Sequence, residues 1–196
     1  MPQPHPVEEI SEEDPEPESN GPPVTSGLEV VFTLDTDDTS PPSDGWLVYQ
    51  LAKACRLVGI EGGQLSVTLV DDPVMSRLHA DHCDDPSTTD VLTFDLADRE
   101  PPRAGDPVTW IEGDIVVCRD VAERQAAARG HDARTELLLY AVHGLMHLLG
   151  EDDHAEEDYS RMHRREDELL TEMGLGPVFH RERLDTPVGG VEGEQA

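Results

Sequence analysis

Lysine is almost missing from this sequence. Lys53 is its single lysine, and 14 basic residues in all face 43 acidic ones, which gives a formal net charge of −29 at pH 7. Residues 1–27 hold seven acids, and residues 177–196 hold four acids and two arginines, which leaves 32 acids against 12 bases between these ends. The ends therefore do not explain the acidity. An acidic, lysine-poor surface is typical of a protein that works at high ionic strength, where salt screens self-repulsion.

Cysteine is scarce too, and long apolar runs are absent. Cys55, Cys83 and Cys118 are odd in number and form no C-x-x-C pair, so we expect reduced thiols in a cytoplasmic protein. No apolar run approaches the 18 residues that a membrane-spanning helix needs. The N-terminus is acidic and proline-rich where a secretory signal would be basic and then apolar, so neither export nor a membrane partner is expected.

The remaining sequence predicts one domain between two tails. Residues 1–26 are rich in Pro, Glu, Asp and Ser, which predicts a disordered acidic tail; residues 27–174 form the domain and 175–196 a polar C-terminal tail. Patterning predicts strands at 27–35, 64–71, 89–96 and 110–118, and helices at 45–58, 73–83, 119–129, in the run from 131 that Gly150 stops, and at 155–173. This order indicates a single layered α/β (α+β) domain with a sheet covered by helices.

Residue type predicts several local details. We expect Asp72 to cap the helix that Pro73 begins, Gly62 and Gly63 to close the connection before a strand, and Gly113 to mark a bulge or a close approach. The residues expected to face inward on the later helices are Val121, Gln125, Ala128, Tyr159, Met162, Leu169, Leu170 and Met173.

Two histidines in the run 131–154 point to a metal site. His143 and His147 are four residues apart, so on a helix both rings can reach one ion. The apolar residues expected on the opposite side of that helix are Leu138, Ala141, Leu145, Leu148 and Leu149. The acidic turn after Gly150 then offers a third ligand, as in a zincin-like site with an open coordination position. The alternative is a pair of ordinary surface histidines that bind no metal.

Three motifs resemble one family. The segments Thr89–Phe94, Gly113–Cys118 and His143–Gly150, followed by Met162, are similar in sequence and order to those of the YbeY family of metal-dependent endoribonucleases. The resemblance implies a mixed four-stranded sheet packed with five or six helices and one Zn²⁺ per chain. It also implies cleavage of single-stranded RNA in 16S rRNA 3′-end maturation and ribosome quality control. The expected partners are ribosomal RNA and small-subunit proteins, and no DNA.

The third metal ligand stays open between two neighbours. The family's third histidine falls on Asp153, while His154 lies one position later and is followed by family-like residues. Imidazole is the better zinc ligand, which favours His154, although a carboxylate also binds zinc. The expected site is therefore His143, His147 and His154 around a metal-bound water, with Asp153 as the alternative.

Substrate-binding and proton-transfer roles have several candidates. The family's usual arginine falls on Cys83, so Arg77 is a candidate phosphate ligand, with His79 and His82 as further candidates to line the cleft. Asp114 is a weak candidate base, and Glu136 and Asp152 are others. The arginines of the last three helices form either a local positive strip or, as we favour, pairs with nearby acids.

Two other function classes remain. A non-catalytic ribosome-assembly factor would use zinc structurally. A zincin-type peptidase is the third possibility, but Gly144 stands where zinc proteases carry their glutamate base, which argues against it.

Overall fold

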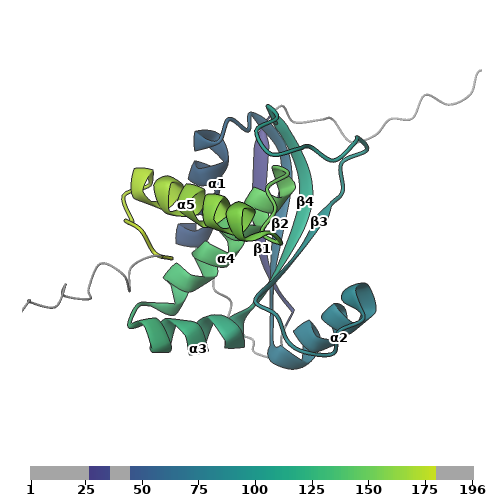
Figure 1. Ribbon diagram of the computed structural model, residues 1–196, viewed down its shortest axis with the longest axis vertical. Coiled ribbons are helices and arrows are strands. Elements are labelled where there is room, and N and C mark those ends of the chain that lie inside the picture. Colours follow the sequence, from purple (N-terminus) through teal and green to yellow (C-terminus); the bar gives the residue numbers. More distant parts are fainter. Residues whose placement is uncertain (1–26, 36–44, 180–196) are drawn as a thin grey trace, which may run out of the picture.

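The computed structural model describes residues 27–35 and 45–179 (Figure 1). In chain order the elements are β1 (Leu28–Asp35), α1 (Gly45–Leu57), β2 (Gly62–Val70), α2 (Asp72–Cys83), β3 (Val91–Asp95), β4 (Trp110–Cys118), α3 (Arg119–Arg129), α4 (Ala133–Leu148) and α5 (Glu156–Glu172). The predicted tail 1–26 and residues 180–196 of the predicted C-terminal tail lie outside the described residues. Residues just past 174 still pack on the core, because Val178 is buried and Leu175 contacts it.

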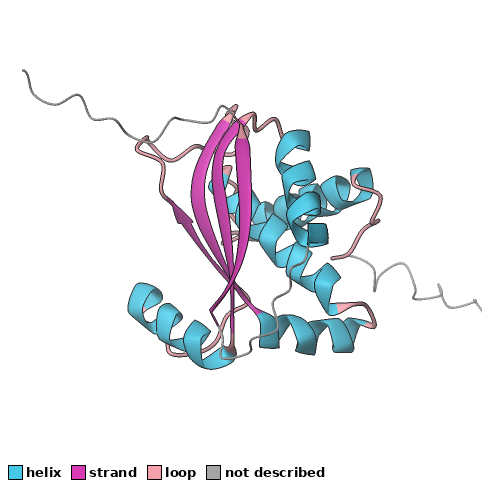
Figure 2. Cartoon of the chain, turned by 180° about the vertical axis from the view of Figure 1, so that it is seen from behind, coloured by secondary structure: helices cyan, strands magenta, loops and turns pink. Residues whose placement is uncertain are grey.

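The four strands form one mixed sheet with the order β1-β2-β4-β3 (Figure 2). β1, β2 and β4 are parallel, and β3 is antiparallel to β4. The parallel pairs need crossover connections, and α1 supplies the one from β1 to β2. Together with the five helices in the described part of the chain, this confirms the α/β fold with a mixed four-stranded sheet.

One face of the sheet carries the core. Leu65, Val67 and Leu69 of β2 and Ile111, Ile115 and Val117 of β4 are all buried on this face. Figure 1 shows α1, α4 and α5 on the same side of the sheet. The alternating positions of β2 and β4 place Gln64, Ser66, Thr68, Glu112, Asp114 and Val116 on the other face, none of which is buried. The chemistry on α4 is therefore separated from Asp114 by the sheet itself.

The central helix α4 is buried on nearly all sides. The five residues predicted to face the core, four on α4 and Leu149 just after it, are buried as expected. The expectation of a one-sided apolar helix is nevertheless wrong, because Tyr140, Val142 and Met146 are buried as well. α4 lies between the sheet and the other helices, and only its two histidines and its first three residues, 133–135, are not buried.

Glycines let α4 approach the sheet closely. A Cβ at Gly113 would lie 2.7 Å from the side chain of Leu148, and a Cβ at Gly144 would lie 2.8 Å from that of Ile115. The predicted role of Gly113 in a close approach is thus confirmed. Residue 144 is the position at which zinc proteases carry their glutamate base. Here it faces the sheet, so a side chain at this position would point toward Ile115 and Thr93.

Other local predictions need correction. Gly62 and Gly63 belong to β2 and pair with Trp110 and Ile111, so they are not part of the connection. Asp71, not Asp72, caps α2, because its Oδ1 accepts a hydrogen bond from the Val74 amide at 3.0 Å. The prediction read one residue too far because two adjacent aspartates offer the same side chain.

Two helix faces also differ from the prediction. On α3 the buried residues are Ala122 and Ala126, whereas Gln125 and Ala128 are exposed. Met162, Leu169 and Leu170 of α5 and Met173 just after it are buried as predicted, but Tyr159 is 43% exposed. Gln125 and Tyr159 line a cavity that is described below. Periodicity alone does not distinguish a side chain that faces a cavity from one that faces the core.

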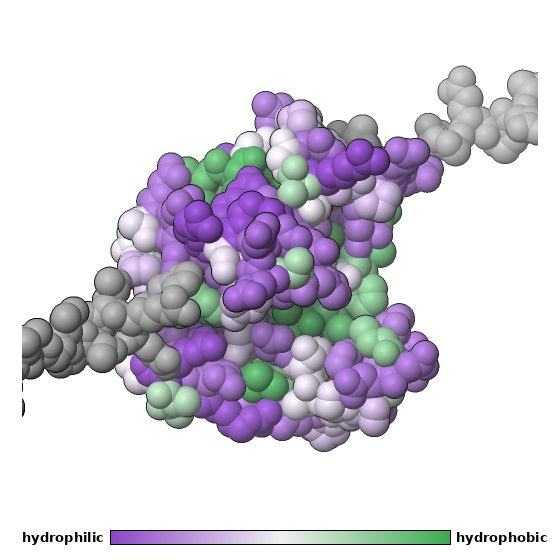
Figure 3. Space-filling view, in the orientation of Figure 1, coloured by the Kyte–Doolittle hydropathy of each residue, from purple (hydrophilic) through white to green (hydrophobic). Residues whose placement is uncertain are grey.

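Several arginines of the described residues form ion pairs with carboxylates. Ion pairs join Arg124 to Asp72, Arg129 to Glu136, Arg165 to Glu151, and Arg161 to both Asp158 and Glu151. The preferred interpretation of these arginines as partners of nearby acids therefore holds for these residues. Figure 3 shows hydrophilic residues covering α5 on this face, with a hollow between α5 and α3. Among the described residues no helix is both long and apolar enough to cross a membrane.

Candidate metal centre

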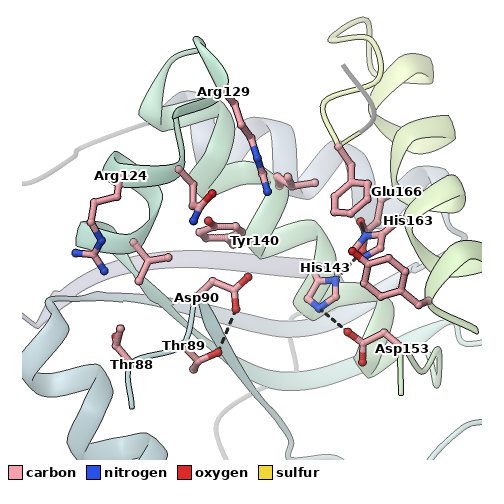
Figure 4. A pocket seen from close by; sticks show the side chains of 15 residues that line it. Thr88, Thr89, Asp90, Arg124, Arg129, Tyr140, His143, Asp153, His163 and Glu166 are labelled. Carbon is pink, nitrogen blue, oxygen red and sulfur yellow. Dashed lines mark hydrogen bonds and ion pairs between the residues drawn. The ribbon is translucent and has the colours of Figure 1, made fainter. Parts of the chain in front are cut away.

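The two histidines of α4 converge as predicted. The Nε2 atoms of His143 and His147 are 3.2 Å apart, and their rings meet edge to face. Asp153, in the loop after α4, places its Oδ2 3.7 Å from Nε2 of His143. One ligand atom from each of the three residues lies within 4.8 Å of the others. Figure 4 shows His143 and Asp153 facing each other.

Each histidine is fixed from behind through its other ring nitrogen. Nδ1 of His143 lies 2.7 Å from Oε1 of Glu166, and Nδ1 of His147 lies 3.1 Å from the carbonyl oxygen of Glu151. Both partners are acceptors, so we assign the proton to Nδ1 in each ring. The Nε2 lone pairs then face the same point, which is the arrangement typical of metal-binding histidines.

The spacing of these atoms fits a small divalent cation. Two nitrogens about 2.05 Å from one ion at a tetrahedral angle lie about 3.3 Å apart. The Nε2–Nε2 separation of 3.2 Å matches that value, and the Asp153 oxygen is close enough to join them with little movement. Two imidazoles and one carboxylate are also a donor set that zinc accepts.

The loop that carries Asp153 is held against α5. Gly150 has φ +83°, and a Cβ there would lie 2.3 Å from the carbonyl oxygen of Pro102, so only glycine fits this turn. The next residue, Glu151, is buried and its carboxylate bonds to Arg161 and Arg165 of α5. The carbonyl oxygen of Glu151 also accepts a hydrogen bond from Nδ1 of His147. Glu151 therefore holds both the turn and the His147 ring in place.

His154 is not brought to the histidine pair. Its side chain is 88% exposed, and its Nδ1 bonds to the carboxylate of Asp152. Asp152, Asp153 and His154 also lie close together, but this second group excludes His143 and His147. The sequence favoured His154 over Asp153, whereas the geometry groups Asp153 with the pair, because the turn after Gly150 points residue 153 inward and residue 154 outward.

The other candidates lie away from this group. The His82 ring packs 4.9 Å from that of Phe94, whose register partner is Asp114. Nδ1 of His79 is 2.9 Å from the carbonyl oxygen of Ser87, and Arg77 is exposed on α2. None of these four candidates lines the cavity beside His143. The structure thus separates α2 and the outer sheet face from the histidine pair.

A cavity of about 570 Å³ opens beside His143. It is lined by Thr88, Thr89, Asp90, Val121, Arg124, Gln125, Arg129, Leu139, Tyr140, His143, Asp153, Tyr159, His163, Glu166 and Phe179. Figure 4 shows His143 and Asp153 at one end, Arg124 at the other with Asp90 between, and Arg129 reaching in from the α3 side. The histidine pair is therefore at the edge of a space large enough for part of a substrate.

Glu166 is the residue of this site that the sequence argument missed. It is fully buried, and its two oxygens bond to Nδ1 of His143 and, at 2.6 Å, to Nδ1 of His163. A signal for it exists in the sequence. Glu166 falls four residues after Met162, on the buried side of α5, and an acid at such a position needs a partner.

The pKa values of these groups are shifted in ways that suit this network. Burial opposes protonation of His143, but the hydrogen bond and charge of Glu166 outweigh it and raise the pKa of His143. Burial and then the nearby His143 lower the pKa of His147. Burial alone would raise the pKa of Glu166, yet its hydrogen bonds from His143 and His163 lower it, so Glu166 stays ionised. An ionised Glu166 makes His143 a more basic ligand.

Replacing Glu166 by glutamine is expected to weaken zinc binding about 10–100-fold, the usual cost of losing an outer partner of a metal-binding histidine. The amide cannot accept from both His143 and His163 through equivalent oxygens. Competition with a chelating dye measures the affinity, and Glu168→Gln, an exposed position on the same helix, is the control. Equal affinities for the Glu166 variant and the parent would show that Glu166 does not support the ligand.

The fold and the site together define an α/β protein that brings two histidines and an aspartate to one point at the edge of a cavity. Residues 46–174 match the family described as Endoribonuclease YbeY. A protein of Staphylococcus saprophyticus with that name is 35% identical over 151 residues, which cover 74% of this chain and 98% of the relative. Another so named, from Renibacterium salmoninarum, is 41% identical over 109 residues, or 55% of this chain and 69% of the relative. The chain belongs to the YbeY family of endoribonucleases.

Among solved structures, the solution structure of a Thermotoga maritima protein is similar. It covers 85% of this chain and 99% of its own, with 20% sequence identity and a TM-score of 0.46.

Proposed function

We propose that this protein is a zinc-dependent endoribonuclease that cleaves single-stranded RNA in 16S rRNA 3′-end maturation and ribosome quality control. The observation that carries the proposal is the pair of Nε2 atoms 3.2 Å apart, next to Asp153, at the edge of a cavity in a chain of the YbeY family. The expected setting is the cytoplasm, with ribosomal RNA as substrate and small-subunit proteins as partners.

In the proposed site His143, His147 and Asp153 hold one Zn²⁺. The ion supplies a Lewis acid for a phosphoryl oxygen and lowers the pKa of a bound water. Glu166 and the Glu151 carbonyl orient the two imidazoles through Nδ1, so that both Nε2 atoms stay available. With one carboxylate in place of a third imidazole, the ion keeps less positive charge, and its water is expected to be less acidic than in a three-histidine site.

Asp90 was not among the bases expected from the sequence, but it lines the cavity, and Figure 4 shows it between Arg124 and His143. Thr89 Oγ1 and the Val91 amide donate to its Oδ1 at 3.1 and 3.0 Å, which leaves Oδ2 toward the cavity as a proton acceptor. Asp114 lies across the sheet, Asp152 bonds to His154, and Glu136 is paired with Arg129. We therefore place Asp90 ahead of these three.

The two alternative functions fit the site less well. Structural zinc sites are usually closed by four protein ligands, whereas this group gathers three ligands and opens on a cavity. A zincin-type peptidase needs a base after the first histidine, but Gly144 packs against Ile115 and Thr93. Both observations support the endoribonuclease.

The proposal is tested with a labelled single-stranded RNA that carries the 3′ region of precursor 16S rRNA. Zinc-loaded protein should cut it internally, chelation should stop the reaction, and added zinc should restore it. The same sequence annealed to its complement should resist. If loaded protein leaves the single strand intact both alone and with small ribosomal subunits, the proposed activity is wrong.

The third ligand has its own test. Asp153→Ala is expected to weaken zinc binding on the order of 100-fold or more, and His154→Ala less than about threefold, because only Asp153 reaches the histidine pair. Both variants remove one polar side chain from the same exposed loop, so each controls for the other. Zinc content after gel filtration and chelator competition report the result. The reverse order would make His154 the ligand.

A further inference from the structure

The side of the cavity formed by α3 carries its positive charge. Val121, Gln125 and Arg129 line it at four-residue spacing on α3, and Arg124 is beside them. The opposite side and centre carry the carboxylates of Asp90, Asp153 and Glu166. The two arginines therefore lie on the α3 side of the cavity, and its carboxylates lie in the centre and on the opposite side.

Arg129 is held in place by a buried carboxylate. Its Nη1 donates to Oε1 of Glu136 at 2.6 Å, and Glu136 is 0% exposed. The other oxygen of Glu136 lies 2.6 Å from Nε2 of His131, whose side chain is also buried. Gly130, with φ +72°, makes the turn that brings the end of α3 next to the start of α4. The guanidinium is thus oriented before any ligand arrives.

Most of the donors of Arg129 remain available. A guanidinium has five N–H groups, and Glu136 is the one acceptor that the described residues offer to this one. The Arg129 side chain is 26% exposed, and Figure 4 shows it extending into the cavity. Arg124 differs, because both of its Nη groups are engaged by the carboxylate of Asp72, at 2.6 and 3.0 Å.

Neutralising Glu136 uses only one edge of the Arg129 guanidinium. The remaining N–H donors face an open space beside a candidate metal group. A planar fork of free N–H donors matches the oxygens of a phosphodiester.

We propose that Arg129, oriented by Glu136, binds a phosphodiester of the RNA next to the one that lies at the His143–His147–Asp153 group. The inference rests on the proposed function. It orients the RNA strand in the cavity, with the reacting phosphate at the histidines and a neighbouring phosphate of the same strand at Arg129 of α3. It also supplies a local cation in a protein whose net charge of −29 repels RNA.

The test uses the double variant Arg129→Gln/Glu136→Gln, which keeps the net charge and leaves no unpaired buried carboxylate. Its matched control is Arg124→Gln/Asp72→Asn, which neutralises the other ion pair at the same cavity. Binding of a fluorescein-labelled, single-stranded 2′-O-methyl RNA of ten nucleotides is measured by anisotropy at several salt concentrations. Cleavage of single-stranded RNA is measured in parallel, with kcat and KM determined separately.

The Arg129 double variant should bind the probe about 10–100-fold more weakly, and its slope of log K against log salt should flatten by about 0.7, the value for one lost phosphate contact on a single strand. KM should rise by a similar factor while kcat changes less than about threefold. The control double variant should stay within about twofold of the parent in affinity. If the Arg129 double variant does not fold, Arg129→Lys, which keeps the charge but loses the fork, should weaken binding about 3–10-fold.

The outcomes separate this inference from the proposed function. Parent protein that binds the probe through Arg129 but cuts no RNA would overturn the nuclease and leave the phosphate site. Parent protein that cuts RNA while the Arg129 double variant keeps its affinity, salt slope and KM would overturn the phosphate site alone. Failure of the parent to bind the probe, or equal losses in both double variants, would also overturn it.

Discussion

The His147→Ala variant, incubated with zinc and then passed through gel filtration, is expected to retain no zinc and to show no ribonuclease activity. Loss of an outer partner of a ligand costs about 10–100-fold in affinity, so loss of the ligand itself should cost more, on the order of 1,000-fold. His143→Ala should behave alike, since its Nε2 is 3.2 Å from that of His147. Elemental analysis and chelator competition measure the effect.

The control for this loss is His79→Ala, a histidine of α2 that does not line the cavity. It should keep about one zinc per chain. A thermal melt of the apoproteins separates loss of metal from loss of fold, because His147→Ala removes one hydrogen bond to Glu151, worth about 1 kcal/mol. If His147→Ala kept stoichiometric zinc at unchanged affinity, the convergence of these rings would have no role in binding an ion.

Gly144→Glu is expected to unfold much of the protein and to create no peptidase. A Cβ at residue 144 would lie 2.8 and 3.0 Å from side-chain atoms of Ile115 and 3.0 Å from Oγ1 of Thr93. Overpacking costs about 1–3 kcal/mol, and an unpaired buried carboxylate adds several more, for a total above about 4 kcal/mol. That is a large part of the 5–15 kcal/mol typical of a domain. Thermal unfolding should show a fall of about 10 °C or more.

Gly45→Glu is the matched control, because Gly45 is also helical but a Cβ there meets nothing within 4 Å. Glutamate in the first turn of α1 is favourable to the helix dipole, so the melting temperature should hold or rise slightly. A Gly144→Glu variant that melts with the parent would mean that α4 can move away from the sheet. If it also hydrolysed casein in the presence of zinc, the peptidase alternative would return.

The convergence of His143 and His147 was predictable because its geometry is local. Residues four apart on a helix share a face wherever the helix lies, so His143 and His147 needed no knowledge of the fold. Strand and helix positions followed from periodicity for the same reason, and α3 was predicted at the residues 119–129 that it occupies. The order of the strands, by contrast, depends on pairings between distant segments and was not predicted; only the mixed four-stranded sheet came from the family resemblance.

The rest of the site depends on how distant segments dock. Glu166 reaches His143 only because α5 packs across α4. The two residues are 23 positions apart in the sequence, and no local pattern predicts that these helices pack together. Arg129 and Glu136 meet through a turn whose direction periodicity does not specify. The choice between Asp153 and His154 rests on single backbone torsions after Gly150, where two adjacent polar residues point in opposite directions.

The last helix supports both histidines of the candidate metal centre. Glu166 of α5 bonds to His143, and Arg161 and Arg165 of α5 bond to Glu151, whose carbonyl oxygen accepts from His147. If the centre binds zinc as proposed, ion binding and packing of that helix are coupled, and each stabilises the other by the same free energy. Removal of zinc should then loosen the C-terminal helix and make the chain more open to proteolysis.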